Sequence, residues 1–380
     1  MLKLTWADAA RWRARQQYLY KRAPAGSLLK VASRLCGLHA QVMSSAELMA
    51  WARVERLGQR AVQKALWHDR TLVKTWAMRG TLHLLPSTEL PMWHAALGIS
   101  RRYLHEKAWQ NNFGIDLAEL EQITEAVATA LTGCVLTREE LMAEVARITG
   151  SANFGKIAGS SWGTILKPAA FSGRLCFATS VGTRVRFTNP GSWLEAELGS
   201  MPVEAATAEV TRRFLTAYGP ATVRDLARWW GASMRTARQW ITELGDEACT
   251  VEVEGTTAWM MVRDTCKVLD VATEHSVRLL PGFDQYVIGA SAHAERLLPG
   301  VLRGLIYRPQ GWVSPVLLVN GRMEGVWRHE VKGRRVEVSV QPFGKGTAWM
   351  RRAAKEEAAH LATFLGRELE FVWNPNELIN

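Results

Sequence analysis

The chain has 380 residues, of which 48% are hydrophobic, so it can bury more than one hydrophobic core and is not a disordered polymer. Its 47 Lys and Arg residues outnumber its 36 Asp and Glu residues, and the resulting net charge of +11 favours a polyanionic partner. No apolar run reaches the roughly 20 residues that cross a bilayer, and the N-terminus lacks a signal-peptide pattern, so we expect a cytoplasmic protein and no membrane partner.

The cysteine and histidine spacings argue against disulfide and metal cross-links. The five cysteines are scattered without a Cys-x-x-Cys pair, and the nine histidines include no His-x-x-x-His pair. We therefore expect reduced thiols, no metal site and no cofactor.

The first part of the chain predicts several helices followed by a hairpin. Helices are expected over residues 7–22, 27–36, from 44 onwards and 58–68. Two β-prone runs, 71–77 and 81–85, flank Arg79-Gly80 and predict two paired strands. Helices followed by a hairpin are the outline of a winged helix-turn-helix module, which we assign to residues 1–115.

The same outline recurs twice, in residues 116–200 and 201–275. For the second module we expect helices near 117–132 and 138–149, a glycine-broken segment over 154–163, a helix over 164–171, and strands over 174–178 and 183–188. Thr137 and Glu140 have the spacing of a capping box. For the third module we expect helices over 202–218, 223–230 and 234–244, and strands over 251–253 and 258–262. Its helix, tight turn and helix are typical of DNA recognition, although such modules also serve for packing or dimerisation.

Residues 276–380 predict an antiparallel, barrel-like β unit. Short strands are expected over 279–288, 316–319, 323–327 and 336–340, followed by a helix over 351–365 and a last strand over 369–373. The turn that carries Lys332, Arg334 and Arg335 suits a phosphate backbone, and an ordinary solvated turn explains it equally well. The expected fold class is therefore α+β, with three tandem winged-helix modules and a C-terminal β unit.

The segment His39-Ala40-Gln41 is the candidate for chemistry. It places an imidazole and a primary amide two residues apart, just before a predicted helix with Ser44 or Ser45 as its N-cap and Glu47 as a capping residue. In an extended or turn conformation both side chains point to one side and could meet at one water molecule. The alternative is that both side chains only satisfy backbone groups at the helix end.

The chain resembles the winged-helix DNA glycosylase family that includes AlkZ and YcaQ. The resemblance covers nearly the whole chain and is carried together by residues 34–38, 44–48, 75–83, 162–171, 281–287, 315–322 and 325–328. The family motif is Gln-x-Gln in its AlkZ-like branch and Gln-x-Asp in its YcaQ-like branch. The sequence His39-Ala40-Gln41 matches the AlkZ-like branch at its second position and departs from it at the first.

The resemblance implies hydrolysis of the N-glycosidic bond of an alkylated purine in double-stranded DNA, such as a bulky N7-guanine adduct or an interstrand crosslink. An N7-alkylated purine is cationic and leaves readily, so a positioned water and stabilisation of an oxocarbenium-like sugar suffice. Gln41 would supply an amide oxygen near the sugar. His39 would hold the water or accept its proton, which a glutamine cannot do.

Basic and aromatic residues predict the DNA contacts. We expect phosphate contacts from Arg79, Lys167, Arg235, Lys332, Arg334 and Arg335, and we expect Trp162 to lie in a groove. Two alternatives stay open. One is a non-enzymatic DNA-binding regulator or damage sensor, favoured by the histidine at the first motif position; the other is a nuclease, which no acidic metal cluster supports.

Overall fold

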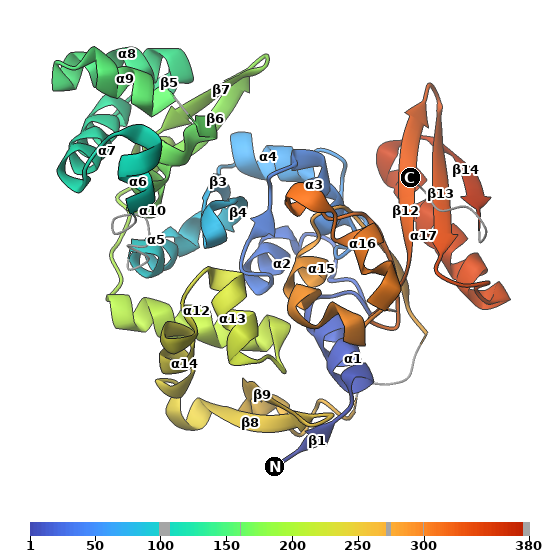
Figure 1. The fold of residues 1–380 in the computed structure, drawn as a ribbon. Coiled ribbons are helices and arrows are strands. Elements are labelled where there is room, and N and C mark those ends of the chain that lie inside the picture. Colours follow the sequence, from blue (N-terminus) through green and yellow to red (C-terminus); the bar gives the residue numbers. More distant parts are fainter. Residues whose placement is uncertain (99–106, 160, 271–274, 299, 375–380) are drawn as a thin grey trace. The chain divides into compact units, whose positions relative to one another are not determined.

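The computed structural model describes residues 1–98, 107–159, 161–270, 275–298 and 300–374 (Figure 1). The chain divides into two compact units. Unit 1 combines Met1–Val62 with Thr211–Asn380, and unit 2 is Gln63–Val210. Each unit contains both helices and strands, which confirms the mixed α and β class. Within the described ranges, no helix has the length and apolar character needed to span a membrane.

Unit 1 begins with a short strand, β1 (Lys3–Leu4), and helix α1 (Trp6–Gln16). Thr5 caps α1 through a capping box with Asp8. The predicted helix over residues 7–22 is wrong at its end, because the chain leaves the helix at Gln17. Tyr18 adopts a left-handed φ of 59°, and the amide of Leu19 donates to the carbonyl of Ala14. Without a glycine at this position, the sequence carried no stop signal.

Three short elements surround the candidate motif: α2 (Leu28–Arg34), β2 (Leu38–His39) and α3 (Met43–Trp51). The predicted N-cap is wrong. Val42 caps α3 without a side-chain hydrogen bond, and Ser44 and Ser45 lie inside its first turn. The expected capping box with Glu47 is therefore absent.

The second half of unit 1 starts with a helical group and a hairpin. α12 (Val203–Tyr218) enters it from unit 2 and is followed by α13 (Val223–Trp230), α14 (Met234–Thr242), β8 (Ala248–Val253) and β9 (Thr256–Met261). Thr222 and Asp225 form a capping box on α13, and Ser233 caps α14. The predicted helix, tight turn, helix and hairpin are all confirmed. β8 pairs antiparallel with β9 and parallel with β1.

The C-terminal sheet has the order β10-β11-β12-β13-β14. Its strands are β10 (Val277–Leu280), β11 (Val316–Val319), β12 (Arg322–Lys332), β13 (Arg335–Pro342) and β14 (Glu368–Trp373). The expected barrel-like closure is not found, since the edge strands β10 and β14 do not pair with each other within the described residues. The expectation of a wholly antiparallel unit is also wrong, because β14 runs parallel to β13. Helix α17 (Ala348–Leu365) supplies the crossover that a parallel pair requires.

Short helical segments lie between β10 and β11. They are α15 (Gln285–Gly289), η7 (Ala290–Arg296), η8 (Gly300–Leu302), α16 (Arg303–Ile306) and η9 (Pro309–Gly311). The strand expected over 279–288 therefore ends at Leu280. Its second half turns into α15 because the Asp284 side chain caps the amide of Tyr286.

The main core of unit 1 joins its two chain segments. Side chains of α1 and α3, among them Ala14 and Trp51, share one hydrophobic cluster with the C-terminal sheet and with α17. The N-terminal residues therefore depend on C-terminal residues for their burial. A second cluster packs Trp6 and Trp12 of α1 against the β8–β9 hairpin.

Unit 2 contains helices and two hairpins. Its helices are α4 (Ala61–Trp67, which starts in unit 1), α5 (Leu90–Gly98), α6 (Lys107–Phe113), α7 (Leu117–Leu131), α8 (Arg138–Thr149), α9 (Ala152–Gly159), α10 (Lys167–Phe171) and α11 (Pro190–Leu194), with 3-10 turns η1 (Met78–Gly80), η2 (Ser87–Glu89) and η4 (Ser161–Leu166). The predicted hairpins are confirmed: β3 (Leu72–Trp76) pairs with β4 (Leu82–Pro86), and β7 (Arg184–Thr188) pairs with β6 (Cys176–Val181) and β5 (Val135–Thr137).

The expected glycine-broken segment over 154–163 is wrong, because most of it forms α9. Gly155 lies inside this helix, where a Cβ atom would come within 2.6 Å of the Met142 carbonyl oxygen and 2.9 Å of the Ala146 Cβ. The glycine thus allows α8 and α9 to approach closely and does not break the helix.

Candidate active site

The candidate motif follows a tight helix end. At the end of α2 the amide of Gly37 donates to the Ala32 carbonyl (2.7 Å) and the amide of Cys36 donates to the Ser33 carbonyl (3.0 Å), which is the pattern of a Schellman motif. Cys36 has a φ of 60° and Gly37 a φ of 95°. A non-glycine residue in the left-handed region costs free energy and persists only where its surroundings hold it. The chain therefore enters His39-Ala40-Gln41 along a fixed path.

The two motif side chains have different environments. His39, in β2, is only 4% exposed, whereas Gln41, two residues before α3, is exposed. The His39 ring stacks on the ring of Phe283 with centroids 5.6 Å apart and an interplanar angle of 19°. The imidazole is thus oriented from within the protein, and the amide is available to a bound molecule. Their meeting at one water molecule remains a prediction.

The segment Phe283-Asp284-Gln285 supports the motif from behind. Gln285 is 1% exposed, and its Nε2 donates to the Gly37 carbonyl at 2.7 Å. Tyr218 adds a second tie, because its hydroxyl donates to the Leu35 carbonyl at 2.8 Å. The carbonyls of Leu35 and Gly37, just before the motif, therefore each accept a hydrogen bond from a residue more than 180 positions away in the chain.

Asp284 forms a buried ion pair with Arg53. Nη1 and Nη2 of Arg53 donate to Oδ2 and Oδ1 of Asp284, both at 2.8 Å, and both side chains are 0% exposed. Oδ1 also accepts the amide of Tyr286 at 2.9 Å. A buried carboxylate with all these partners is a structural group.

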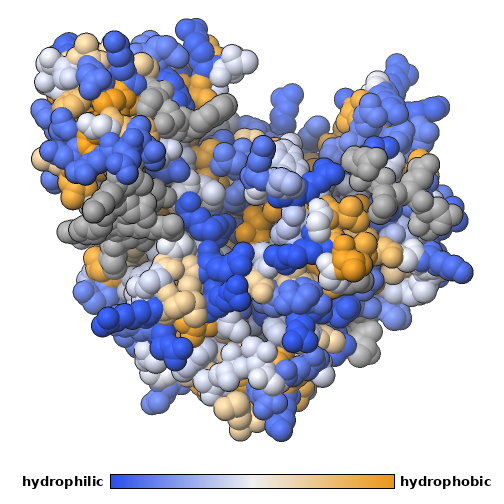
Figure 2. Space-filling view, in the orientation of Figure 1, coloured by the Kyte–Doolittle hydropathy of each residue, from blue (hydrophilic) through white to orange (hydrophobic). Residues whose placement is uncertain are grey.

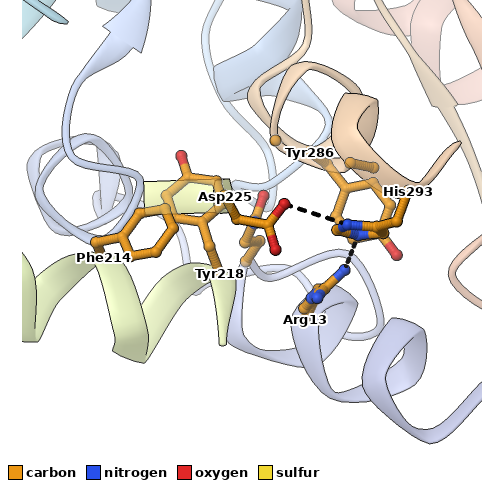
Figure 3. Close-up of a pocket in the computed structure, with 9 residues that line it drawn as sticks. Arg13, Phe214, Tyr218, Asp225, Tyr286 and His293 are labelled. Carbon is orange, nitrogen blue, oxygen red and sulfur yellow. Dashed lines mark hydrogen bonds and ion pairs between the residues drawn. The ribbon is translucent and has the colours of Figure 1, made fainter. Parts of the chain in front are cut away.

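A second buried polar network joins α1, α13 and η7 (Figure 3). Asp225 and Arg13 approach His293 from two sides, with Asp225 Oδ1 3.3 Å from His293 Nδ1 and Arg13 Nη1 2.5 Å from Nε2. Burial and the Arg13 charge lower the pKa of His293 below its ordinary value. Burial acts to raise the pKa of Asp225, but the hydrogen bond to His293 and nearby positive charges outweigh it and lower that pKa. A neutral His293 can accept from Arg13 and donate to Asp225.

The predicted DNA contacts of unit 1 lie on α14 and on the tip of the β12–β13 hairpin. Arg235, on α14, is exposed, as are Lys332, Arg334 and Arg335 at the hairpin tip. The tip is hydrophilic on its surface (Figure 2). Lys332 contacts Glu337 at 2.7 Å, which raises the pKa of Lys332, and Arg335 lies 3.6 Å from Glu368. To bind DNA, Lys332 and Arg335 would have to leave their carboxylate partners and contact phosphates instead.

The remaining predicted contacts belong to unit 2. Arg79 lies in η1 with a left-handed φ of 57°, and its side chain is partly buried. Lys167 begins α10 and is also partly buried, and this burial lowers its pKa. The backbone of Trp162 lies in η4, but its side chain lies outside the described part of the structure.

Sequence reasoning missed the residues that position the motif. Phe283 and Gln285 belong to a segment that carried the family resemblance, but nothing in their spacing indicated contact with residues 37–39. Within the described residues there is no group of three or more His, Cys, Asp or Glu side chains that could hold a metal ion.

Comparisons with known proteins place the chain among the DNA glycosylases. A family model described as DNA glycosylase AlkZ-like matches residues 32–364, and the chain belongs to this family. It is 35% identical over 370 residues to the interstrand DNA cross-link repair glycosylase of Streptomyces sahachiroi, a match that covers 96% of this chain and 98% of that protein. The solved structure of Streptomyces sahachiroi DNA glycosylase AlkZ is similar, with a TM-score of 0.87 and 34% identity over 98% of this chain and 100% of the other.

Proposed function

We propose that the protein hydrolyses the N-glycosidic bond of alkylated purines in duplex DNA, with bulky N7-guanine adducts or interstrand crosslinks as its substrates. The observation that carries the proposal is the His39-Ala40-Gln41 motif, rigidly held from behind by Phe283 and Gln285. The 35% identical relative is an interstrand cross-link repair glycosylase, which supports the substrate class.

Gln41 and His39 divide the work in this mechanism. An N7-alkylated purine carries a positive charge, so its glycosidic bond breaks with little protonation of the base. The exposed Gln41 directs its amide oxygen toward the sugar and stabilises the oxocarbenium-like transition state. The oriented His39 positions the attacking water and accepts its proton, a contribution on the order of 100- to 10,000-fold in rate. No cofactor is required.

Three winged-helix modules and a C-terminal β unit would hold the DNA. We divide the chain into modules 1–115, 116–200, 201–275 and 276–380. The hairpins β3–β4, β6–β7 and β8–β9 are the wings of the three modules, and α14 with Arg235 is a recognition helix. Arg79, Lys167, Lys332, Arg334 and Arg335 contact phosphates, and Trp162 lies in a groove.

The enzyme would serve DNA repair or self-resistance to a DNA-alkylating natural product. Its substrate is chromosomal DNA, so we place its action at the nucleoid in the cytoplasm. The net charge of +11 supports this assignment, because positive surface charge increases the rate of association with DNA.

The test is base release under single-turnover conditions. Wild type, His39→Ala, Gln41→Ala and the control Ser44→Ala would be compared on one duplex that carries N7-methylguanine and on one that carries a bulky N7 adduct. Ser44 is a matched control because it is exposed and only a few residues from the motif. We expect release by wild type and Ser44→Ala, and a loss of about 100-fold or more in each motif variant with DNA binding retained.

Absence of release by wild type from both duplexes, with tight DNA binding, would overturn the proposal and favour a regulator or damage sensor. A regulator would bind one DNA sequence much more tightly than bulk DNA, whereas a glycosylase follows the lesion.

A further inference from the structure

Trp312 is exposed, which is unusual for a tryptophan in this chain. Among the tryptophans whose side chains the structure describes, it alone is largely exposed, with 53% of its surface accessible. Others such as Trp12, Trp51 and Trp93 are almost completely buried. Moving a large aromatic ring out of water lowers the free energy of the system. An exposed indole therefore suggests a surface that another molecule covers.

The loop that carries Trp312 is well defined. Tyr307 and Val313 form an antiparallel bridge, and the amide of Arg308 donates to the Trp312 carbonyl at 2.9 Å. Gln310 and Gly311 reverse the chain with left-handed φ values of 60° and 78°. The indole therefore stands at the base of a closed hairpin loop and not on a free strand of chain.

Phe283 connects this loop to the catalytic motif. The indole of Trp312 meets the Phe283 ring edge-on, with centroids 4.8 Å apart, and Phe283 in turn stacks on His39. The backbone is joined as well, because the Phe283 amide donates to the Val313 carbonyl at 3.2 Å. The rings of His39, Phe283 and Trp312 thus lead from the buried histidine of the motif to the surface.

The surroundings of Trp312 suit a nucleic acid. Arg308, at the start of the loop, is exposed, and Arg303 of α16 lies over the Tyr307 ring at 4.7 Å. Apolar side chains gather on the surface over α16 among hydrophilic ones (Figure 2), and Val301 just before it is 93% exposed. Aromatic and apolar groups beside cations are the combination that binds unstacked bases and the adjoining phosphates.

We propose that Trp312 stacks on a nucleobase beside the damaged nucleotide and so holds the duplex open next to His39 and Gln41. The inference rests on the proposed glycosylase function and specifies how the lesion is brought to the motif. Every base has an aromatic face, so this contact recognises a disturbed stack and not a sequence. A damaged base pair is easier to unstack, which gives the contact its preference for lesions.

The experiment compares wild type, Trp312→Ala, Trp312→Phe and the control Leu269→Ala. Leu269 is a matched control because it is an exposed apolar residue of the same unit, 57% accessible. Affinity would be measured for an undamaged duplex and for one with a 2′-fluorinated N7-methylguanosine, whose glycosidic bond resists hydrolysis. The emission of 2-aminopurine placed beside the lesion would report unstacking, and base release would be timed on the ordinary N7-methylguanine duplex.

We expect Trp312→Ala to weaken binding of the damaged duplex by about 10-fold or more and to slow base release, while binding of the undamaged duplex changes by less than about 3-fold. Wild type should change the 2-aminopurine emission and Trp312→Ala should not. Trp312→Phe keeps an aromatic ring and should restore most of the lesion preference, and Leu269→Ala should match wild type.

Equal lesion preference and equal 2-aminopurine response in wild type and Trp312→Ala would overturn the inference, even if wild type releases the base. Conversely, a wild type that releases no base while Trp312→Ala loses lesion preference would overturn the glycosylase proposal and leave the stacking contact supported. The binding measurements do not depend on turnover, so the two failures are distinguishable.

Discussion

The buried pair of Arg53 and Asp284 provides a test of how the motif is held. Asp284→Ala removes the carboxylate and leaves the guanidinium of Arg53, with 0% exposure, without its charge partner. Breaking such a pair costs about 3–5 kcal/mol, because the remaining charge stays desolvated. The variant also loses the cap that Asp284 provides for the Tyr286 amide, which on its own contributes roughly 0.5–2 kcal/mol.

The same substitution acts on the candidate motif His39-Ala40-Gln41 through the residues on either side of Asp284. Phe283 and Gln285 flank Asp284 and supply the ring stacked on His39 and the hydrogen bond to Gly37. With both losses, we expect Asp284→Ala to lower the free energy of unfolding by about 3.5–7 kcal/mol and to slow base release at temperatures where the variant is still folded.

A double-mutant cycle measures the interaction energy of the pair. Its four members are wild type, Asp284→Ala, Arg53→Met and the double variant Arg53→Met/Asp284→Ala, each unfolded with denaturant. The double variant should be less destabilised than the sum of the two single variants by about 2 kcal/mol or more, since no unpaired charge remains. The pair does not stabilise the fold as we argue if the free energies of unfolding of Asp284→Ala and wild type differ by less than about 1 kcal/mol. The same holds if the losses in the two single variants simply add up to the loss in the double variant.

Two further predictions concern a hydrogen bond and a buried histidine. Gln285→Leu removes the donor to the Gly37 carbonyl and should slow base release by roughly tenfold or more, with lesion binding within about threefold of wild type, as measured by single-turnover kinetics and anisotropy; an unchanged rate would contradict a positioning role. Burial lowers the pKa of His94 from 6.5 to about 4, so the folded state resists its protonation, and stability should fall as the pH drops from about 6.5 to 4. At about 1.4 kcal/mol per pKa unit the loss is about 3 kcal/mol, and His94→Gln should show a shallower decline of unfolding free energy over this range; parallel declines would contradict the assignment.

Local sequence signals predicted most of the elements of the fold. The capping box of Thr137 and Glu140 marked the start of α8, and β-prone runs located the three hairpins. The errors have physical causes. Tyr18 ends α1 in a left-handed conformation that glycine usually adopts, and Gly155 serves helix packing where a break was expected. The parallel pairing of β13 and β14 was readable in principle, because a predicted helix separates the two strands.

The candidate site was predictable only in part. The motif itself stands out as a polar pair in an apolar segment, and the family resemblance indicated its role. Its support did not stand out, because the contacts between Gly37 and Gln285 and between His39 and Phe283 join segments far apart in the chain. A pattern of spacing within one segment cannot report such pairs. Trp312 was missed for the same reason, since its exposure and its contact with Phe283 are properties of the folded chain.

The discontinuity of unit 1 has a consequence for synthesis of the protein. Residues 37 and 285 are separated by 248 positions, and all of unit 2 is made between them. At about 5–20 residues per second, the ribosome needs roughly 12–50 seconds to supply Gln285 after it has made Gly37. During that interval the emerging chain carries the complete motif without its supports. An incomplete chain that ends between residues 41 and 283 therefore contains the motif without the Phe283 ring and the Gln285 hydrogen bond that hold it in the folded protein.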